Sequence, residues 1–185
     1  GVTNGDYAGW SVSNAGDVNG DGFDDVIVGA SYADPNGDSS GSSYVVFGKV
    51  SGFSATMDLS SLDGDNGFRL DGVSADDSLG RIVSNAGDVN GDGFDDLIIG
   101  ALFTEPHISS YVVFGKASGF GATMDLSSLD GSNGFRLYGA LYDYFESVSS
   151  AGDVNGDGFD DLIVGTLYGV FNNFHNDSSY VVFGK

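Results

Sequence analysis

The nine-residue stretch Asp17–Asp25 (DVNGDGFDD) is repeated without change at Asp88–Asp96 and at Asp153–Asp161. A second stretch, VVFGK, also occurs three times, and its copies end at Lys49, Lys116 and Lys185. Two stretches that recur in the same order indicate an array of similar structural units. We therefore predict that the chain is built from three sequence repeats.

Each repeat is predicted to contain short β-strands joined by turn-rich loops. In the first repeat, Ser11–Ala15 is rich in small residues, and Val26–Val28 is a short apolar run typical of a strand buried on both faces. The third strand, Tyr44–Phe47, is β-branched and aromatic. The fourth, Phe68–Leu70, recurs at Phe135–Leu137, each time after a loop that contains DLSSLDG. No segment shows a sustained helical period, so the sequence predicts an all-β fold.

Four antiparallel strands per repeat are typical of the blade of a β-propeller. The small residues of the first strand suit the crowded axis of such a fold, where the innermost strand of each blade lies. An up-and-down barrel or a β-solenoid is the alternative. The fixed four-fold order of strand types disfavours the barrel, and we predict a propeller.

All three repeats are expected to belong to one propeller domain. Residues 1–66 form the first blade with a linker, and residues 67–133 form the second blade, opening with the outer strand of the first (Phe68–Leu70). Residues 134–185 form a third blade that lacks its outer strand. Propellers close with about four to eight blades. We therefore expect a partial propeller, completed by repeats of a parent chain or by self-association with other copies.

The net charge narrows the range of partners. Six Lys and Arg face 27 Asp and Glu, a formal charge of −21. Such a chain repels phosphate backbones and anionic lipid, and it has no apolar run long enough for a membrane span, so we predict no nucleic-acid binding and no membrane insertion. Four acidic residues lie in each copy of the nine-residue motif. This concentration suggests carboxylates that are neutralised by bound cations.

The motif places oxygen-bearing side chains at positions 1, 3, 5 and 9, a glycine at position 6 and a backbone carbonyl at position 7. Ca²⁺ prefers six to eight oxygen ligands, and glycine permits a sharp turn between them. An EF-hand is excluded because position 12 holds Val28 instead of a glutamate, and because strands flank the loop. Mg²⁺ retains more waters, and a metal-free turn is the remaining alternative. The predicted ligands of three Ca²⁺ ions, one per repeat, are Asp17, Asn19, Asp21, Phe23, Asp25, Asp88, Asn90, Asp92, Phe94, Asp96, Asp153, Asn155, Asp157, Phe159 and Asp161.

A strand, the pattern D-x-N-x-D-G-x-x-D and an apolar strand that ends in Gly-Ala together resemble the FG-GAP repeat of integrin α-subunit propellers and of bacterial surface or secreted proteins. The Phe-Gly signature of that family is Ala8-Gly9 here, which weakens an inference of integrin function but not of fold. The resemblance implies that the Ca²⁺ loops join the first and second strands on one face, and that partners bind the opposite face. We expect a protein or glycan ligand there. It also implies an extracellular or cell-surface protein, which we expect to be bacterial.

On that opposite face the three repeats differ from one another, and the third is the most aromatic. Aromatic side chains can stack on sugar rings or anchor a protein partner, although these rings could instead pack between blades. The candidate partner-binding residues are Tyr142, Tyr144, Tyr168, Phe171, Phe174 and His175. Two further expectations concern single positions: Trp10 is exposed or at an edge, and position 8 of the motif (Asp24, Asp95, Asp160) faces solvent or a neighbouring blade.

The sequence offers no catalytic residues. It has no G-x-S-x-G elbow, no cysteine and no histidine cluster with zinc spacing. We predict a non-catalytic, calcium-binding module for extracellular adhesion or protein–protein interaction. The alternatives are a carbohydrate-binding propeller and a structural repeat that assembles into a ring or fibre.

Overall fold

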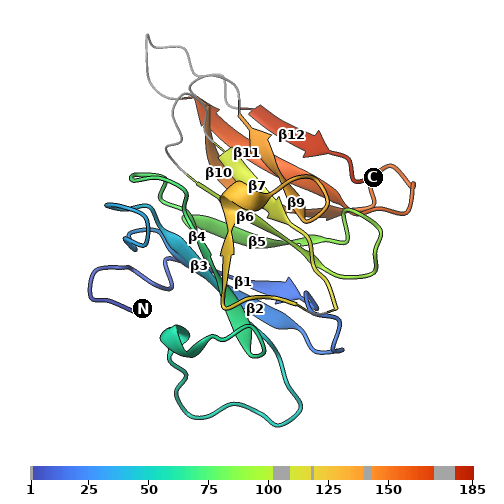
Figure 1. Ribbon diagram of the computed structural model, residues 1–185. Coiled ribbons are helices and arrows are strands. Elements are labelled where there is room, and N and C mark those ends of the chain that lie inside the picture. The colour runs from blue at the N-terminus through green and yellow to red at the C-terminus, as the bar shows by residue number, and fades with distance from the viewer. Residues whose placement is uncertain (1, 102–108, 118, 140–142, 169–177) are drawn as a thin grey trace.

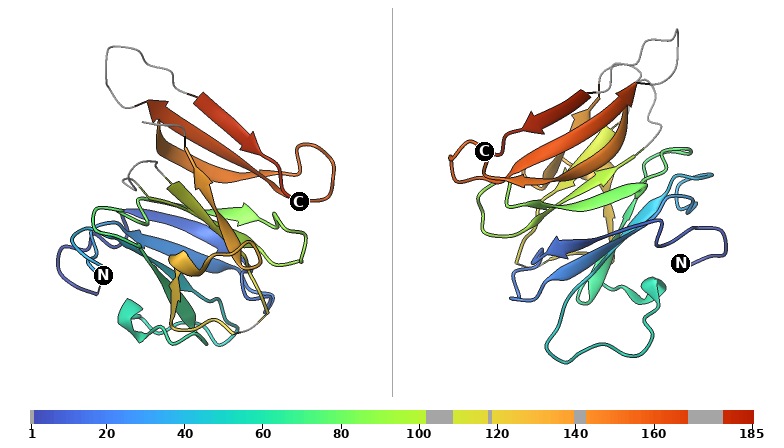
Figure 2. Two further views of the ribbon diagram at one scale, coloured as in Figure 1. Left: turned by 45° about the horizontal axis from the view of Figure 1, so that its top comes forward. Right: turned by 180° about the vertical axis from the view of Figure 1, so that it is seen from behind.

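The computed structural model describes residues 2–101, 109–117, 119–139, 143–168 and 178–185 (Figure 1). Three antiparallel sheets follow one another along the chain and lie one above the other, as the colours from blue to red show in Figures 1 and 2. The predicted all-β fold, with three successive propeller blades, is confirmed.

The first two sheets contain the four strands predicted for a blade. The first holds β1 (Ser11–Gly16), β2 (Asp25–Ala30), β3 (Ser42–Val46) and β4 (Gly67–Asp71) in that order. The second holds β5 (Ile82–Gly87), β6 (Asp96–Gly100), β7 (Ser109–Val113) and β9 (Gly134–Tyr138). The third holds β10 (Asp143–Gly152), β11 (Asp161–Tyr168) and β12 (Ser178–Val182), and it has no fourth strand within the described part of the chain.

A β-bulge at the end of the first strand leads into the repeated motif. In β1 the register shifts between Asn14 and Gly16, and the backbone N–H of Gly16 donates to Asn14 Oδ1 (2.9 Å). Gly16 has a φ of 73°, a left-handed conformation that glycine adopts without steric cost. The same shift occurs before Gly87 and Gly152. A bulge bends its strand, so the same bulge in each repeat directs the chain into the motif in the same way.

The sheets pack face to face through apolar side chains. Between the first and second sheets, Ile27 and Val45 face Leu97 and Ile99 in one buried cluster. Between the second and third sheets, a second cluster is formed by Ala86, Val89, Ile98, Val112, Phe145, Val148, Leu162 and Val164. The predicted burial on both faces is confirmed for β6, which lies between two sheets. It is wrong for β2 and β11, where Val26 (46% exposed) and Ile163 (42% exposed) lie on the outer faces of the first and third sheets.

The segments that contain DLSSLDG, predicted to be loops, include short regular elements. The DLSSL segments form two short 3₁₀ helices, η1 (Leu59–Ser61) and η2 (Leu126–Ser128). The carboxylates of Asp58 and Asp125 cap them by accepting the backbone N–H of Ser60 (2.9 Å) and Ser127 (2.8 Å). Just before η2, β8 (Thr123–Asp125) adds to β4 in parallel, so a segment of the second repeat extends the first sheet.

A glycine allows the first two sheets to approach each other at β2. A Cβ atom at Gly29 would lie 1.9 Å from the carbonyl oxygen of Gly80, whereas at the equivalent Gly100 the nearest atom would be Ile82 Cβ at 3.4 Å. We expect Gly29→Ala to lower the free energy of unfolding by about 1–3 kcal/mol, because backbone would have to move. Gly100→Ala is the matched control and should cost far less. Urea unfolding of both variants at one calcium concentration measures the difference, and equal costs would contradict this account of the contact.

Candidate metal centres and partner face

The repeated motif forms a tight loop between the first and second strands of each sheet. In the first loop the Asp17 carboxylate accepts the backbone N–H groups of Asp21 (Oδ1, 3.0 Å) and Gly22 (Oδ2, 2.8 Å). Asn19 Oδ1 also accepts from the N–H of Asp21 (2.9 Å), and Asp21 Oδ1 accepts from that of Phe23 (2.9 Å). The same bonds recur in the other two loops. Polar side chains at alternate positions thus point to the inside of the curled loop.

The aspartate at position 9 is fully buried and has a structural role that the sequence did not reveal. Asp25 Oδ2 accepts the backbone N–H of Val18 (3.0 Å), and Oδ1 accepts that of Gly48 (2.8 Å) just beyond β3. Asp96 and Asp161 make the equivalent bonds in their repeats. One carboxylate therefore connects the loop to the residue that follows the third strand of the same blade.

Burial and neighbouring charge make these carboxylates harder to ionise. Burial, reinforced by the nearby carboxylates of Asp21 and Asp17, raises the pKa of Asp25 to about 6 despite its two N–H bonds. In the second repeat the same causes raise the pKa of Asp96 to about 7. A cation bound among these oxygens would favour the ionised form instead.

The donor set of each loop fits a hard cation. Three carboxylates, one amide and one backbone carbonyl are all oxygen donors, the type that Ca²⁺ prefers. Within the five described ranges, however, no three His, Cys, Asp or Glu side chains come close enough together to hold a metal ion. Several of the loop oxygens accept backbone N–H groups instead. Ligation by the predicted residues therefore stays a prediction.

Position 8 of the motif connects neighbouring blades. Asp95 Oδ2 accepts the backbone N–H of Asp17 (2.8 Å), and Asp160 Oδ2 accepts that of Asp88 (3.0 Å). The backbone N–H groups of the same two residues donate back to the carbonyl oxygens of Asp17 (3.3 Å) and Asp88 (3.0 Å). Asp24 in the first loop is exposed. The expectation that position 8 faces either solvent or a neighbouring blade is confirmed, with both cases present.

The phenylalanine at position 7 makes a second contact with the preceding loop. The ring of Phe94 lies so close to Gly20 that a Cβ atom there would be 2.3 Å from it, and Phe159 covers Gly91 in the same way. We call this pair of contacts, from positions 7 and 8 of one loop to the loop before it, the loop interlock. A sign of this contact was present in the sequence. The glycine at position 4 and the aspartate at position 8 recur in all three copies, although neither is among the predicted metal ligands.

The contribution of one loop interlock to the stability of the fold should be measurable by mutation. Asp95→Ala removes the side chain that accepts the backbone N–H of Asp17 and should lower the free energy of unfolding by about 1–2 kcal/mol. Asp24→Ala is the matched control, since it occupies the same position in a loop without a preceding blade in this chain, and it should change stability by no more than about 0.5 kcal/mol. Urea unfolding at constant calcium compares them. Equal effects would show that the bond to Asp17 contributes nothing.

Most of the predicted partner-binding residues lie outside the part of the chain that the structure describes. Tyr142, Phe171, Phe174 and His175 lie outside the described residues. Tyr144 lies in β10 and Tyr168 in β11, but their side chains are not described. These candidates stay predictions.

An aromatic cluster that was not predicted from the sequence lies in the first repeat. Tyr7, Trp10 and Tyr32 are exposed, and their ring centroids are 5.0–6.4 Å apart. The Arg81 guanidinium of the second repeat lies 5.9 Å from the centre of the Trp10 ring. Trp10 precedes β1 and Tyr32 follows β2, so the cluster sits at the end of the sheet opposite the loops. The expected exposure of Trp10 is confirmed, and aromatic residues at both open ends of the β1–β2 pair were the signal.

Comparison with known proteins agrees with this arrangement. The family model of the FG-GAP repeat matches residues 8–46, 79–104 and 145–182. The chain is 30% identical over 153 residues to integrin alpha-6 of Gallus gallus, covering 82% of this chain and 13% of that protein. It is 32% identical over 168 residues to integrin alpha-PS5 of Drosophila melanogaster, covering 87% and 15%. It is also 30% identical over 193 residues to the phosphatidylinositol-glycan-specific phospholipase D of Bos taurus, covering 93% and 21%.

The chain thus spans only a small part of the length of these relatives. Among the described residues, none of the helices has the length and apolar character needed to cross a membrane.

Proposed function

Since the chain belongs to the FG-GAP repeat family, we propose that it is a calcium-binding β-propeller module of an extracellular or cell-surface protein, that it serves adhesion or protein–protein interaction, and that it is itself non-catalytic. The observation that carries this proposal is the threefold recurrence of one loop with the same oxygen donors and the same internal hydrogen bonds. The similarity to integrin alpha chains supports the adhesive and extracellular part.

The proposed ligands of each ion are the residues at positions 1, 3, 5 and 9 and the carbonyl oxygen at position 7. Once bound, Ca²⁺ would neutralise the carboxylates of Asp21 and Asp17, which add to the effect of burial in raising the pKa of Asp25. Each carboxylate oxygen has a further lone pair beside its N–H bond, so the loop can gain a cation without losing its hydrogen bonds. Millimolar extracellular calcium suits sites of weak to moderate affinity.

Isothermal titration with Ca²⁺ tests the proposal. We expect one ion per loop, and we expect Asp21→Asn to remove one of the three, because position 5 would lose its charge. Asp24→Asn lies outside the proposed ligand set of the same loop and should leave the number of ions unchanged. No binding at millimolar calcium, or the same loss in both variants, would contradict the assignment.

A second candidate function rests on the aromatic cluster. Three exposed rings beside a guanidinium form a surface on which sugar rings can stack, in the manner of a carbohydrate-binding propeller. A glycan array compares the wild-type chain with Trp10→Ala. Binding that Trp10→Ala abolishes, at unchanged calcium stoichiometry, would favour this candidate. An array without any signal would favour a protein partner on that face.

A further inference from the structure

The three predicted calcium loops contact one another along one edge of the stacked sheets. Figure 2 (right) shows them one above the other at that edge. Each later loop contacts the one before it through the loop interlock, which is made by positions 7 and 8. In the second loop these positions are Phe94 and Asp95, and Asp96 follows directly at position 9. The residues that form the interlock are therefore the same as, or adjacent to, residues whose oxygens are proposed calcium ligands.

The residues that receive this contact belong to the ligand segment of the first loop. Asp95 Oδ2 accepts the backbone N–H of Asp17, the proposed ligand at position 1 (2.8 Å). The Phe94 ring covers Gly20, which lies between the proposed ligands at positions 3 and 5. A displacement of the ligand segment in either loop would therefore disturb the other loop.

A second connection joins the buried carboxylates at position 9. Asp25 Oδ2 accepts the N–H of Val18 (3.0 Å), and the carbonyl oxygen of Val18 accepts the N–H of Lys116 (2.9 Å). The neighbouring N–H of Gly115 donates to Asp96 Oδ1 (2.9 Å). We call this run of hydrogen bonds the carboxylate bridge. It leads from a proposed ligand of the first loop to a proposed ligand of the second.

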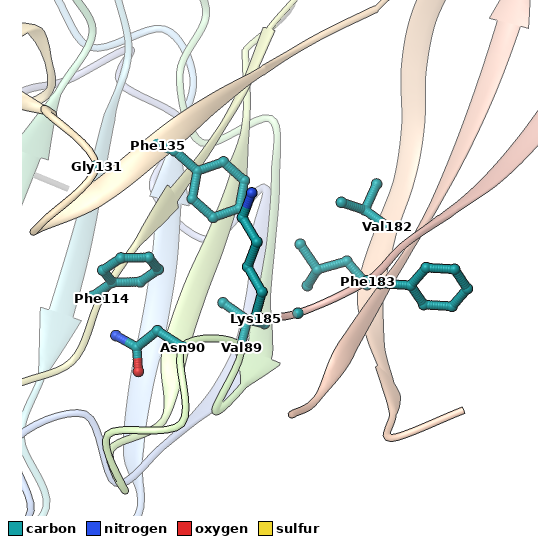
Figure 3. Close-up of a pocket in the computed structure, with 10 residues that line it drawn as sticks. Val89, Asn90, Phe114, Gly131, Phe135, Val182, Phe183 and Lys185 are labelled. Atoms are coloured by element: carbon teal, nitrogen blue, oxygen red, sulfur yellow. The ribbon is translucent and has the colours of Figure 1, made fainter. Parts of the chain in front are cut away.

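The carboxylate bridge is repeated between the second and third loops. Asp96 Oδ2 accepts the N–H of Val89 (3.0 Å), and the carbonyl oxygen of Val89 accepts the N–H of Lys185 (2.9 Å). Gly184 N–H donates to Asp161 Oδ1 (3.0 Å). Figure 3 shows Lys185 beside Val89 at the second loop. Asp96 thus takes part in both bridges, and these hydrogen bonds join the first and third loops only through the second.

The carboxylate bridges lie in the interior of the protein. Val18, Asp25 and Asp96 are fully buried, and Val89 is 4% exposed. Water is therefore largely excluded from the hydrogen bonds that run between the loops, and such bonds are stronger than exposed ones. A change at one position 9 carboxylate should consequently reach the next.

We propose that the calcium sites of neighbouring loops are positively coupled, so that occupation of one loop raises the calcium affinity of the next about tenfold. This inference rests on the calcium binding proposed above. The element with two states is the contact between loops, which is either formed or broken. Ligand oxygens held in one loop keep that contact formed, so the neighbouring loop loses less conformational entropy when its own site is filled. Because coupling is reciprocal, either loop can be filled first.

Charge acts in the opposite direction. A bound Ca²⁺ cancels two negative charges of its loop, which reduces the attraction of the neighbouring loop for a second ion. The carboxylates of Asp21 and Asp92 are exposed, and at about 0.15 M salt exposed charges more than about 8 Å apart are largely screened from each other. Salt weakens the buried hydrogen bonds of the carboxylate bridges much less. We therefore expect positive coupling at physiological salt.

Three equivalent variants test the coupling, because each removes one proposed site by the same substitution at position 5. In Asp21→Asn and in Asp157→Asn the two remaining loops are neighbours, whereas in Asp92→Asn they are not. Calcium-binding isotherms are measured at physiological salt, at a protein concentration at which light scattering shows a monomer. For the two variants with neighbouring loops, tenfold coupling between equal sites predicts a Hill coefficient of about 1.5, and for Asp92→Asn we expect about 1 or less.

The number of bound ions and the Hill coefficient answer separate questions. Two bound ions in every variant, with the same Hill coefficient in all three, would overturn the coupling and leave calcium binding in place. A higher coefficient in Asp92→Asn than in the other two variants would also overturn it. The absence of calcium binding by the wild-type chain would overturn the proposed function and this inference together.

A further pair of variants tests the loop interlock as the route of the coupling. In the Asp157→Asn background the first and second sites remain, and Asp95→Ala removes a side chain that connects them. Asp24→Ala is the matched control, because it makes the same substitution at position 8 of the first loop, where the side chain is exposed. Neither residue is a proposed ligand, so both variants should bind two ions. We expect Asp95→Ala to lower the Hill coefficient and Asp24→Ala to leave it unchanged; equal coefficients would overturn the role assigned to the interlock.

Discussion

Removal of calcium is expected to lower the free energy of unfolding by several kcal/mol. With a dissociation constant of about 10 µM, a site at millimolar calcium contributes about 2.7 kcal/mol by mass action, so three sites contribute about 8 kcal/mol. The physical reason is that the buried carboxylates of Asp25 and Asp96 each lie near two further carboxylates, whose repulsion the bound ion removes. Thermal unfolding with calcium and with a chelator measures the effect.

Two controls make this test specific. Magnesium at the same concentration should restore much less stability than calcium, because Mg²⁺ retains several waters and suits an all-protein site poorly. Asp21→Asn should show a smaller response to chelation than the wild type, in proportion to the one site it loses. An unchanged melting temperature after chelation would mean that ions are incidental to the fold.

We also expect the isolated chain to associate with other copies of itself. Val12, on the outer face of the first sheet, is 65% exposed, whereas its equivalent Val83 is 5% exposed between two blades. On the outer face of the third sheet Ile163 is 42% exposed, whereas its equivalent Ile98 is fully buried. The two outer faces therefore carry the two halves of an interface that the chain already forms twice.

The first and third loops are complementary to each other in the same way as the two outer faces. Phe23 is exposed, and a Cβ atom at Gly156 would meet nothing within 4 Å, so each end holds one half of a loop interlock. Because the two halves lie on different surfaces, contact between copies should be head-to-tail. We expect light scattering to show concentration-dependent assembly in calcium.

Two charge variants distinguish this arrangement from other forms of association. Val12→Lys blocks one outer face and Ile163→Lys blocks the other, so each variant alone should remain monomeric. A mixture of the two retains one intact face of each kind and should form dimers but nothing larger. A compact, calcium-loaded wild-type monomer would contradict the head-to-tail prediction, as would assembly of either variant alone.

The parts of the structure that the sequence predicted well are those in which identical residues have identical surroundings. The motif around Asp17 forms the same loop three times because its hydrogen bonds are local. The apolar run at Leu97 predicted a strand that is buried on both faces, whereas the similar run at Val26 lies in an end sheet and Val26 itself is exposed.

The parts that were missed depend on contacts between repeats. Residues 52–58 and 119–125 are almost identical, yet only the second segment contains a strand, β8. The difference is that β4 lies beside the second segment, and no local pattern encodes that neighbour. Contact of position 8 with a neighbouring blade was expected, but the particular partner of Asp95 and the cluster around Trp10 were not predicted. In both cases the residues that meet are far apart in the chain.

The loop interlock has a consequence for how such a chain can change during evolution. Every repeat carries both the residues that contact the loop before it, such as Phe94, and the glycine that receives the loop after it, such as Gly91. A tandem duplication of one repeat would therefore place matching parts side by side at each new junction, without any compensating mutation. Deletion of a repeat would rejoin equally compatible neighbours. The number of blades can thus drift by whole genetic units, while the loops at the other end of each sheet diverge independently.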